Sequence, residues 1–186
     1  MGKLFERIDD EVAAFIKAQQ MFFVATAPLS AEGHVNLSPK GLDSFAILDD
    51  QTVVYADLIG SGVETVAHIR ENGRIVMMFC AFDGEPNIIR LHGRGEVIPP
   101  HHPDFDSLQE LFPHYTALRS FIRVTCDRIA DSCGWGVPLY EFQGQRSQYI
   151  DFTNKAGVDG VREYQAQNNR ESIDGLPGIE PNWGED

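Results

Sequence analysis

The sequence predicts a mainly β protein, namely a partly open antiparallel barrel with one helix before it and one helix inserted into it. Residues 36–97 alternate apolar segments typical of strands with short turns. A single amphipathic segment, Glu64–Glu71, separates the strands Thr52–Leu58 and Arg74–Phe82. A doubly wound parallel sheet would need repeated alternation of strands and helices, which this order lacks. With 186 residues, the chain fits one domain with a substantial core.

The first residues predict a helix followed by a hairpin. Apolar side chains recur every three or four residues over Phe5–Gln20, which is the spacing of an amphipathic helix. Met21–Ala27 is rich in strand-forming residues, and Pro28 and Gly33 provide a turn before a second strand at Val35–Ser38. We expect the helix to pack one face on the sheet.

The rest of the chain predicts further strands and a tail. A proline-rich loop after Ile98 leads into a short helix with Phe105 and Leu108 on one face, and from about Lys155 one short helical stretch precedes an arm rich in Gly, Pro and acids. The other predicted strands are Phe45–Leu48, Thr52–Leu58, Arg74–Phe82, Ile88–Ile98 and Phe121–Ile129. We therefore expect a barrel over residues 1–150, and a short helix with an extended arm of the same domain over residues 151–186.

The charge disfavours two classes of partner. Fifteen Lys and Arg face 28 Asp and Glu, so the net charge is −13. Such a chain repels nucleic acids and anionic membrane surfaces at long range. No segment resembles a secretory signal or reaches the ~20 apolar residues of a membrane span. We expect a cytoplasmic protein.

Cysteines and histidines do not predict a metal site. The three cysteines, Cys80, Cys126 and Cys133, lack CxxC spacing, so neither a disulfide framework nor a zinc knuckle is indicated. His101 and His102 are adjacent in a proline-rich loop, and neither they nor His114 form a pair at fixed helical spacing. We expect no metal.

The turn Gly60–Gly62 is the main candidate for ligand binding. It joins a buried strand to a helix, where free N–H groups can receive an anion, and Lys40 and Arg90 add positive charge nearby. Each feature also has a plainer interpretation: a tight turn, an exposed lysine, and a basic residue on a solvated strand face. Trp135 lies between two glycines, where it either stacks over a ligand or anchors the loop in the core.

The order of these segments resembles a known family. MFFVATA, HVNLSPKG, VVYADLIGSGVETVAHIREN, RIVMMF and RLHGRGEV follow one another as in the FMN-binding split barrel of the pyridoxamine 5'-phosphate oxidase-related proteins. The resemblance covers roughly residues 5–150. The SCGWGVPLYEF loop and the SIDGLP tail are similar to an uncharacterised branch of this family, not to the oxidase proper.

This resemblance implies a Greek-key split barrel that binds FMN between the two subunits of a homodimer. The phosphate would meet Lys40, Ser61 and the start of the following helix, and the flavin ring would lie along Asn36–Lys40 and Tyr55–Asp57. The implied cofactor-binding residues are Asn36, Ser38, Pro39, Lys40, Tyr55, Ala56, Asp57, Ser61, Gly62, Thr65, Arg90 and Trp135.

The chain departs from the oxidase at two places. The oxidase clamps the phosphate with an Arg-Lys pair where this chain has Gly62 and Val63, so Arg70, Arg74 or Arg90 would have to supply that charge. The oxidase also has a C-terminal substrate motif with Arg and Trp, and this motif has no match in the present chain after Phe142. We therefore do not expect oxidation of pyridoxamine phosphate.

Two classes of function remain. The first is an FMN-dependent oxidoreductase acting on an unidentified small molecule, in which the cofactor carries the chemistry. No catalytic residue is assigned, and Asp57 and His68 are the nearest titratable groups. The second is a non-catalytic binding module, or a barrel loaded with deazaflavin F420 or heme, since related split barrels accept those groups.

Overall fold

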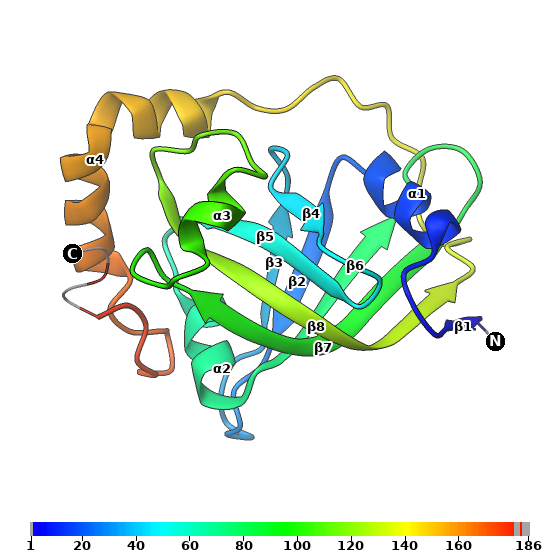
Figure 1. The fold of residues 1–186 in the computed structure, drawn as a ribbon, viewed down its shortest axis with the longest axis horizontal. Helices are drawn as coiled ribbons and strands as arrows, with labels where there is room; N and C mark the ends of the chain where they lie inside the picture. The colour runs from blue at the N-terminus through cyan, green and yellow to red at the C-terminus, as the bar shows by residue number, and fades with distance from the viewer. Residues whose placement is uncertain (1, 181–182, 184–186) are drawn as a thin grey trace.

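The computed structural model describes residues 2–180 and 183. It contains a curled antiparallel sheet and four helices, so the expected mainly β, partly open barrel is confirmed (Figure 1). The strands are β1 (Leu4–Phe5), β2 (Phe22–Thr26), β3 (Asn36–Lys40), β4 (Phe45–Ile47), β5 (Thr52–Leu58), β6 (Arg74–Cys80), β7 (Ile88–Ile98) and β8 (Leu118–Ser132). The helices are α1 (Asp10–Ala18), α2 (Glu64–Asn72), α3 (Phe105–Gln109) and α4 (Gln148–Asn168).

The strand order is β3-β2-β6-β7-β8-β5-β4, and β1 also pairs with β8. Strands β6, β7 and β8 form a meander, and β5 returns beside β8, which is a Greek-key arrangement. Helix α2 makes the connection from β5 to β6. All described strand pairs are antiparallel, and short loops join β3 to β4, β4 to β5 and β6 to β7, whereas a longer connection that contains α3 joins β7 to β8.

The sheet curls until its two ends meet through side chains. Phe22 on β2 lies 5.3 Å, centroid to centroid, from Phe45 on β4, although these strands are far apart in the strand order. Phe79 of β6 completes the cluster at 5.0 Å from Phe45. Aromatic rings fill the interior where no hydrogen bonds join β3 to β4, and this closes the split barrel.

Helix α1 is shorter than the helix predicted over Phe5–Gln20. The carboxylate of Asp9 accepts a hydrogen bond from the N–H of Val12 at 2.9 Å, so the helix begins after Asp9. Phe5 belongs instead to β1, where it pairs with Ile129. Val12 and Ile16 are the buried residues of α1 and join the main core.

Helix α4 is longer than the short stretch predicted from about Lys155. It covers 21 residues and has a kink at Gly157, whose φ of 68° lies in the left-handed region. Figure 1 shows its two parts at an angle, at the end of the molecule opposite the N-terminus. The arm after α4 does not simply extend, since Glu171 and Pro177 form a bridge. Residues 181–182 and 184–186 of the predicted arm lie outside the described residues.

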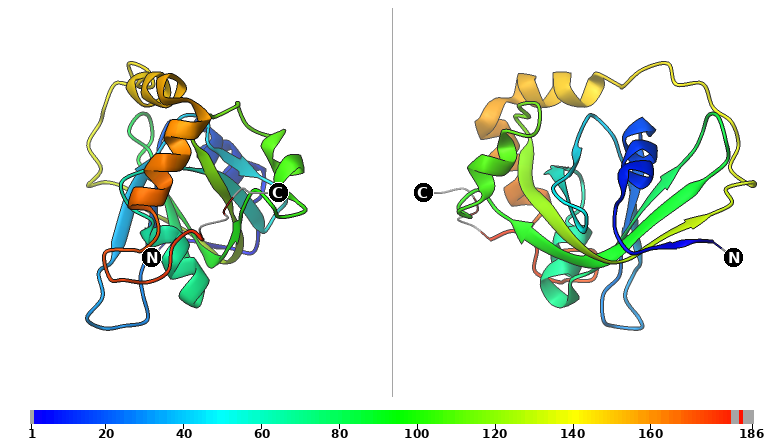
Figure 2. Two further views of the ribbon diagram at one scale, coloured as in Figure 1. Left: turned by 90° about the vertical axis from the view of Figure 1, so that its left-hand side faces the viewer. Right: turned by 45° about the vertical axis from the view of Figure 1, so that its right-hand side comes forward.

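The segment between β8 and α4, residues 133–147, is called the strap below. In Figures 1 and 2 it arches over one side of the barrel, from the end of β8 to α4. It carries exposed apolar side chains, among them Trp135, Leu139 and Phe142. Within residues 2–180 and 183, no helix combines the length and apolar character needed to cross a bilayer.

Candidate functional site

An open groove of about 1110 Å³ lies between the strap and the barrel. Its floor includes Lys40 and Gly41 at the end of β3, and its roof includes Tyr140 and Phe142 of the strap. The strap is tied down at two points: Tyr140 N–H donates to Phe82 O at 2.8 Å, and the Gln145 amide donates to Gln20 O at 3.1 Å. The groove therefore has a rigid floor and a roof held by few bonds.

Strand β3 directs three predicted residues to the interior face of the sheet. Asn36, Ser38 and Lys40 occupy alternate positions and are partly buried, whereas Leu37 between them is exposed. Ser38 Oγ donates to Asn36 Oδ1 at 3.2 Å, and Asn36 Nδ2 donates to Thr65 Oγ1 on α2 at 2.9 Å. A polar chain thus links the edge strand to the first turn of α2.

This polar chain continues into the core at Thr26 and His68. The His68 Nδ1 atom lies 2.9 Å from Thr26 Oγ1, which also accepts a bond from Asn36 at 3.3 Å. Burial lowers the pKa of His68, so its imidazole is neutral at pH 7. Its Nε2 atom has no hydrogen-bond partner among the described residues.

Asp57, on the inward face of β5, is the charged centre of the site. Its side chain is fully buried, and Arg119 Nε donates to Asp57 Oδ2 at 2.8 Å. Ser120 Oγ is 3.3 Å from the same oxygen. The other oxygen, Oδ1, has no hydrogen bond, and Lys40 Nζ lies 3.6 Å from it. Lys40 also lies 5.8 Å from the centroid of the Tyr55 ring.

Two cations hold this buried carboxylate in its ionised form. Burial acts to raise the pKa of Asp57, but the charges of Arg119 and Lys40 outweigh burial and lower it. Burial likewise raises the pKa of Tyr55, which stays a neutral phenol. The cluster of Asp57, Arg119 and Lys40 therefore holds one negative and two positive charges, and Lys40 is the more exposed of its two cations.

The turn Gly60–Gly62 is fastened from its inner side. Arg119 Nη1 donates to Gly62 O at 3.0 Å, and Asn169 Nδ2 donates to Gly60 O at 3.0 Å. Arg119 Nη1 also donates to Asn169 Oδ1 at 2.9 Å. One residue before the turn, Ile59 O accepts a bond from the Tyr149 hydroxyl at 2.8 Å. The turn is thus held by side chains from β8, from the beginning of α4 and from the residue after its end.

The start of α2 already has a negative group beside it. The Glu64 carboxylate lies against Gly62, since a Cβ built at Gly62 would be 2.1 Å from Glu64 Oε2. Glu64 Oε1 also accepts a bond from Ile173 N–H in the C-terminal arm, at 3.3 Å. A second anion is therefore better accommodated near Ser61 and Lys40 than at the helix start.

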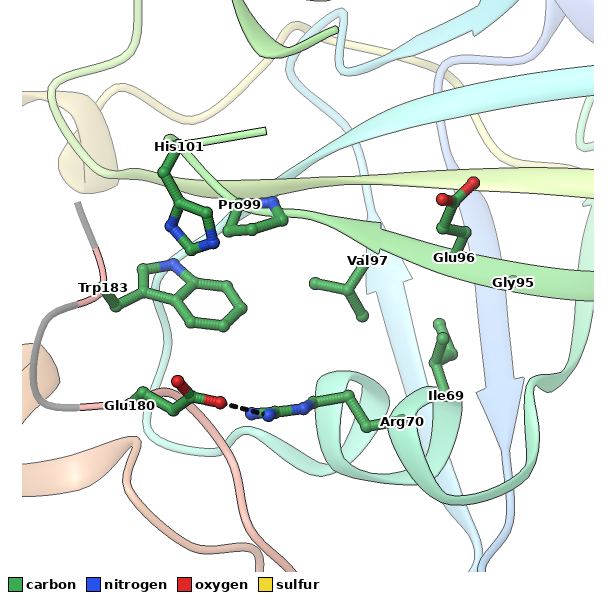
Figure 3. Close-up of a pocket in the computed structure, with 9 residues that line it drawn as sticks. All are labelled: Ile69, Arg70, Gly95, Glu96, Val97, Pro99, His101, Glu180 and Trp183. Atoms are coloured by element: carbon green, nitrogen blue, oxygen red, sulfur yellow. Dashed lines mark hydrogen bonds and ion pairs between the residues drawn. The ribbon is translucent and has the colours of Figure 1, made fainter. Parts of the chain in front are cut away.

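A smaller pocket of about 340 Å³ is lined by α2, β7 and the C-terminal arm (Figure 3). Arg70 and Glu180 form an ion pair there, and the Trp183 ring lies beside His101, with centroids 6.4 Å apart. Trp183 Nε1 donates to Arg119 O at 2.8 Å. Arg70, considered above as a source of phosphate charge, is engaged with Glu180 and Gly178 O.

Three of the predicted residues lie away from Lys40. Ala56 is buried on the opposite face of β5, in the cluster that includes Phe105. Arg90 is on β7, three strands from β3, and donates to Ser132 Oγ at 2.7 Å. Trp135 is 83% exposed on the strap, so neither its stacking role nor its role as a core anchor is seen in one chain alone.

The other predicted residues gather around the groove and the turn. Contacts join Asn36, Ser38 and Thr65 in one group and Lys40, Tyr55 and Asp57 in another. Pro39 lines the groove, and Ser61 and Gly62 form the turn. Their role in binding remains a prediction.

Sequence reasoning missed Arg119, Asn169 and Thr26. The predicted strand began at residue 121, which left Arg119 in a loop. A signal for it existed: a lone acid inside the apolar strand TVVYADL requires a buried cation as its partner. No local pattern identifies Asn169, because its partners are more than 45 positions away in the sequence.

Comparison with known proteins agrees with this architecture. Residues 8–133 match the family model described as pyridoxamine 5'-phosphate oxidase. A pyridoxamine 5'-phosphate oxidase family protein, ustO of Aspergillus flavus, is 35% identical over 198 residues, covering 96% of this chain and 78% of the relative.

Solved structures share the fold at lower identity. A variant of HupZ from Group A Streptococcus is 25% identical with a TM-score of 0.52, over 67% of this chain and 99% of that protein. A pyridoxamine 5'-phosphate oxidase-like protein of Lactobacillus delbrueckii is 14% identical with a TM-score of 0.53, over 68% and 98%. With the family model matching well over half of the chain, this protein belongs to the pyridoxamine 5'-phosphate oxidase family.

Proposed function

We propose that the protein binds FMN in the groove beside Lys40 and acts as an oxidoreductase on a small organic molecule. The observation that carries this proposal is the position of Lys40. It lines the groove, and it is also the more exposed of the two cations around buried Asp57. A phosphate dianion placed there would meet a net positive charge in a partly buried setting, where ion pairs are screened less than at the surface.

The residues present fit a flavin phosphate without the Arg-Lys clamp of the oxidase. Lys40 and Arg119 together exceed the charge of Asp57 by one. The Asp57 Oδ1 atom has no hydrogen bond of its own, so Lys40 keeps donor capacity for a ligand. Glu64 occupies the helix start, so we place the phosphate near Ser61 and Lys40.

The groove also fits a flat aromatic ring. Its roof carries Tyr140 and Phe142, and Gly41, which has no side chain, lines the floor and allows close approach. When bound, FMN would supply hydride acceptance, which protein side chains cannot provide. The chain's own residues bind the phosphate, orient the ring and exclude water under the strap. We assign no side chain to acid or base catalysis.

We further propose a homodimer that completes the site. Four large apolar residues of the strap, Trp135, Leu139, Tyr140 and Phe142, are each more than half exposed. Leu37 on the edge strand β3 is 63% exposed. Apolar side chains along an unpaired edge favour cover by a second copy. The three free cysteines favour a reducing compartment, and we keep the cytoplasm as the proposed location.

Deazaflavin F420 and heme remain the alternatives to be tested. Among the residues that the structure describes, the groove lining contains no histidine and no cysteine, the proximal ligands used by most haem proteins. This chemistry favours a flavin over heme. F420 shares the flat ring and the phosphate, so only identification of the bound compound separates the two.

The test is an absorption spectrum of protein purified without added cofactor, followed by denaturation and mass identification of the released compound. Bands near ~375 and ~450 nm with released FMN support the proposal. A colourless protein that also fails to take up added FMN would overturn it. A Soret band or released F420 would replace FMN by the corresponding alternative.

A further inference from the structure

We propose that Asn169 is a positioning residue that holds the turn Gly60–Gly62 in its phosphate-binding form. The inference rests on the proposed function and extends it to a segment beyond the family core, which ends at residue 133. Asn169 is the residue directly after α4, and it is fully buried. No sequence feature had pointed to it.

The side-chain amide of Asn169 both donates and accepts hydrogen bonds at the turn. Its Nδ2 atom donates to Gly60 O at 3.0 Å, and a longer contact of 3.4 Å reaches Gly62 O. Its Oδ1 atom accepts from Arg119 Nη1 at 2.9 Å. A side-chain amide offers these two functions on two separate atoms, a donor for a carbonyl and an acceptor for a guanidinium. Arg119 in turn donates to Gly62 O at 3.0 Å.

These bonds decide which way the N–H groups of the turn point. In a trans peptide unit the C=O of one residue and the N–H of the next point in opposite directions. Because Gly60 O is drawn inward to Asn169, the N–H group of Ser61 points outward. No described residue accepts a hydrogen bond from this N–H group. Val63 is fully buried, so the turn presents the Ser61 N–H as its donor, on the side where Ser61 is exposed.

Asn169 is itself fixed by the end of α4 and by the C-terminal arm. Its N–H donates to Gln165 O at 2.9 Å, and its C=O accepts from Ile179 N–H at 2.9 Å. The backbone of the arm passes so close that a Cβ at Gly178 would lie 2.4 Å from Asn169 O and 2.6 Å from Val63 Cγ1. The arm thus locks the amide against the turn.

The prediction is specific to the phosphate of the ligand. FMN and riboflavin share the ring and differ in the phosphate, so a misplaced turn lowers the affinity for FMN and not the affinity for riboflavin. We expect Asn169→Ala to lower the affinity for FMN about tenfold, which is the scale of one lost hydrogen bond, and to leave the affinity for riboflavin unchanged. Asn169→Asp keeps the size and the acceptor for Arg119, but it loses the donor and adds a negative charge, so it should weaken FMN binding at least as much.

The experiment titrates the full-length apoprotein with FMN and with riboflavin by flavin fluorescence, and records the melting temperature of each variant. Asn168→Ala is the matched control, because Asn168 is exposed and, among the described residues, its amide donates to Tyr164 O in its own helix and not to the turn. A ³¹P spectrum of bound FMN adds a readout of the phosphate environment, which should shift in Asn169→Asp and not in Asn168→Ala.

The outcomes separate the two proposals. Selective loss of FMN affinity in both Asn169 variants supports the positioning role. If the affinities for FMN and riboflavin fall equally, or if neither falls in a variant that remains folded, the positioning role is wrong while FMN binding stands. Should Asn169→Ala fail to fold, Asn169→Asp decides alone. If the wild-type protein takes up neither flavin, the proposed function itself fails, and this inference with it.

Discussion

Asp57 and Arg119 form an ion pair of 2.8 Å between neighbouring strands, with side chains that are 0% and 4% exposed. Breaking such a pair by removing one partner strongly destabilises a protein, because the remaining charge stays buried without a partner. Here the pair also joins the barrel to the turn Gly60–Gly62, through Arg119 Nη1. Its integrity therefore affects both the stability of the fold and the shape of the candidate site.

We expect Arg119→Leu to lower the free energy of unfolding by about 3–5 kcal/mol, because it leaves Asp57 charged and buried. Arg123→Leu is the control. Arg123 lies on the same strand and pairs with Glu96 and Asp104 near the surface, so its loss should cost less than about 1 kcal/mol. Urea unfolding followed by circular dichroism measures both. Equal losses of unfolding free energy in the two variants would show that the buried pair contributes no more to stability than the pairs near the surface.

The low pKa of Asp57 predicts an acid-dependent loss of stability. The ordinary pKa of this carboxyl is 3.8 and folding lowers it, so the stabilisation is complete above about pH 4 and disappears as the pH falls through the folded-state value. Unfolding free energies of the wild type and Asp57→Asn from pH 7 downward test this. The difference between them should shrink below pH 3.8. A difference that stays constant with pH would contradict the assignment.

Lys40→Met should lower the affinity for FMN by about 10- to 100-fold, which is the range of a charge-assisted hydrogen bond, and leave the affinity for riboflavin nearly unchanged. The reason is that Lys40 provides the excess positive charge beside the groove. Lys17→Met, an exposed change in the last turn of α1, serves as the control. Equilibrium titration gives the affinities. An FMN affinity unaffected by Lys40→Met would remove Lys40 from the site.

The exposed strap predicts an effect on assembly. Replacing both Trp135 and Leu139 by Ala should raise the dimer dissociation constant at least about tenfold, since buried aromatic anchors dominate interfaces. Leu111→Ala is the control, because Leu111 is also exposed but lies just after α3, outside the strap. Sedimentation velocity across a dilution series measures the constant. An unchanged dimer would place the interface elsewhere, and a wild-type monomer would contradict the dimer itself.

The close packing of the C-terminal arm predicts that Gly178→Ala destabilises the protein by about 1–3 kcal/mol. The added methyl group would collide with Asn169 O and the Val63 side chain. Gly136→Ala is the control, because a Cβ there meets no atom within 4 Å. Chemical unfolding compares the two, and limited proteolysis reports whether the arm is released. Equal stability of both variants would mean that the arm adjusts without cost.

The sequence by itself determined the antiparallel barrel, the inserted helix and a strand at Val35–Ser38, which overlaps β3. These follow from local patterns: apolar alternation, turn residues and the spacing of one helix. The positions of Asn36, Ser38 and Lys40 on one face follow from the period of two in a strand. The length of α4 did not follow: the sequence predicted only a short helical stretch from about Lys155, whereas α4 begins at Gln148 and continues past a kink at Gly157.

Only the tertiary structure decided how the charges are paired and what holds the turn. Asp57, Arg119 and Asn169 come from β5, β8 and the residue after α4, and no spacing along the chain connects them. The requirement that a buried charge has a partner demands some cation near Asp57, but it does not say which one. The choice of Arg119 depends on the pairing of β5 with β8, and the contact with Asn169 depends on how the kinked α4 brings its end back to the barrel. Long-range packing of this kind arises from the whole fold, which local sequence patterns do not encode.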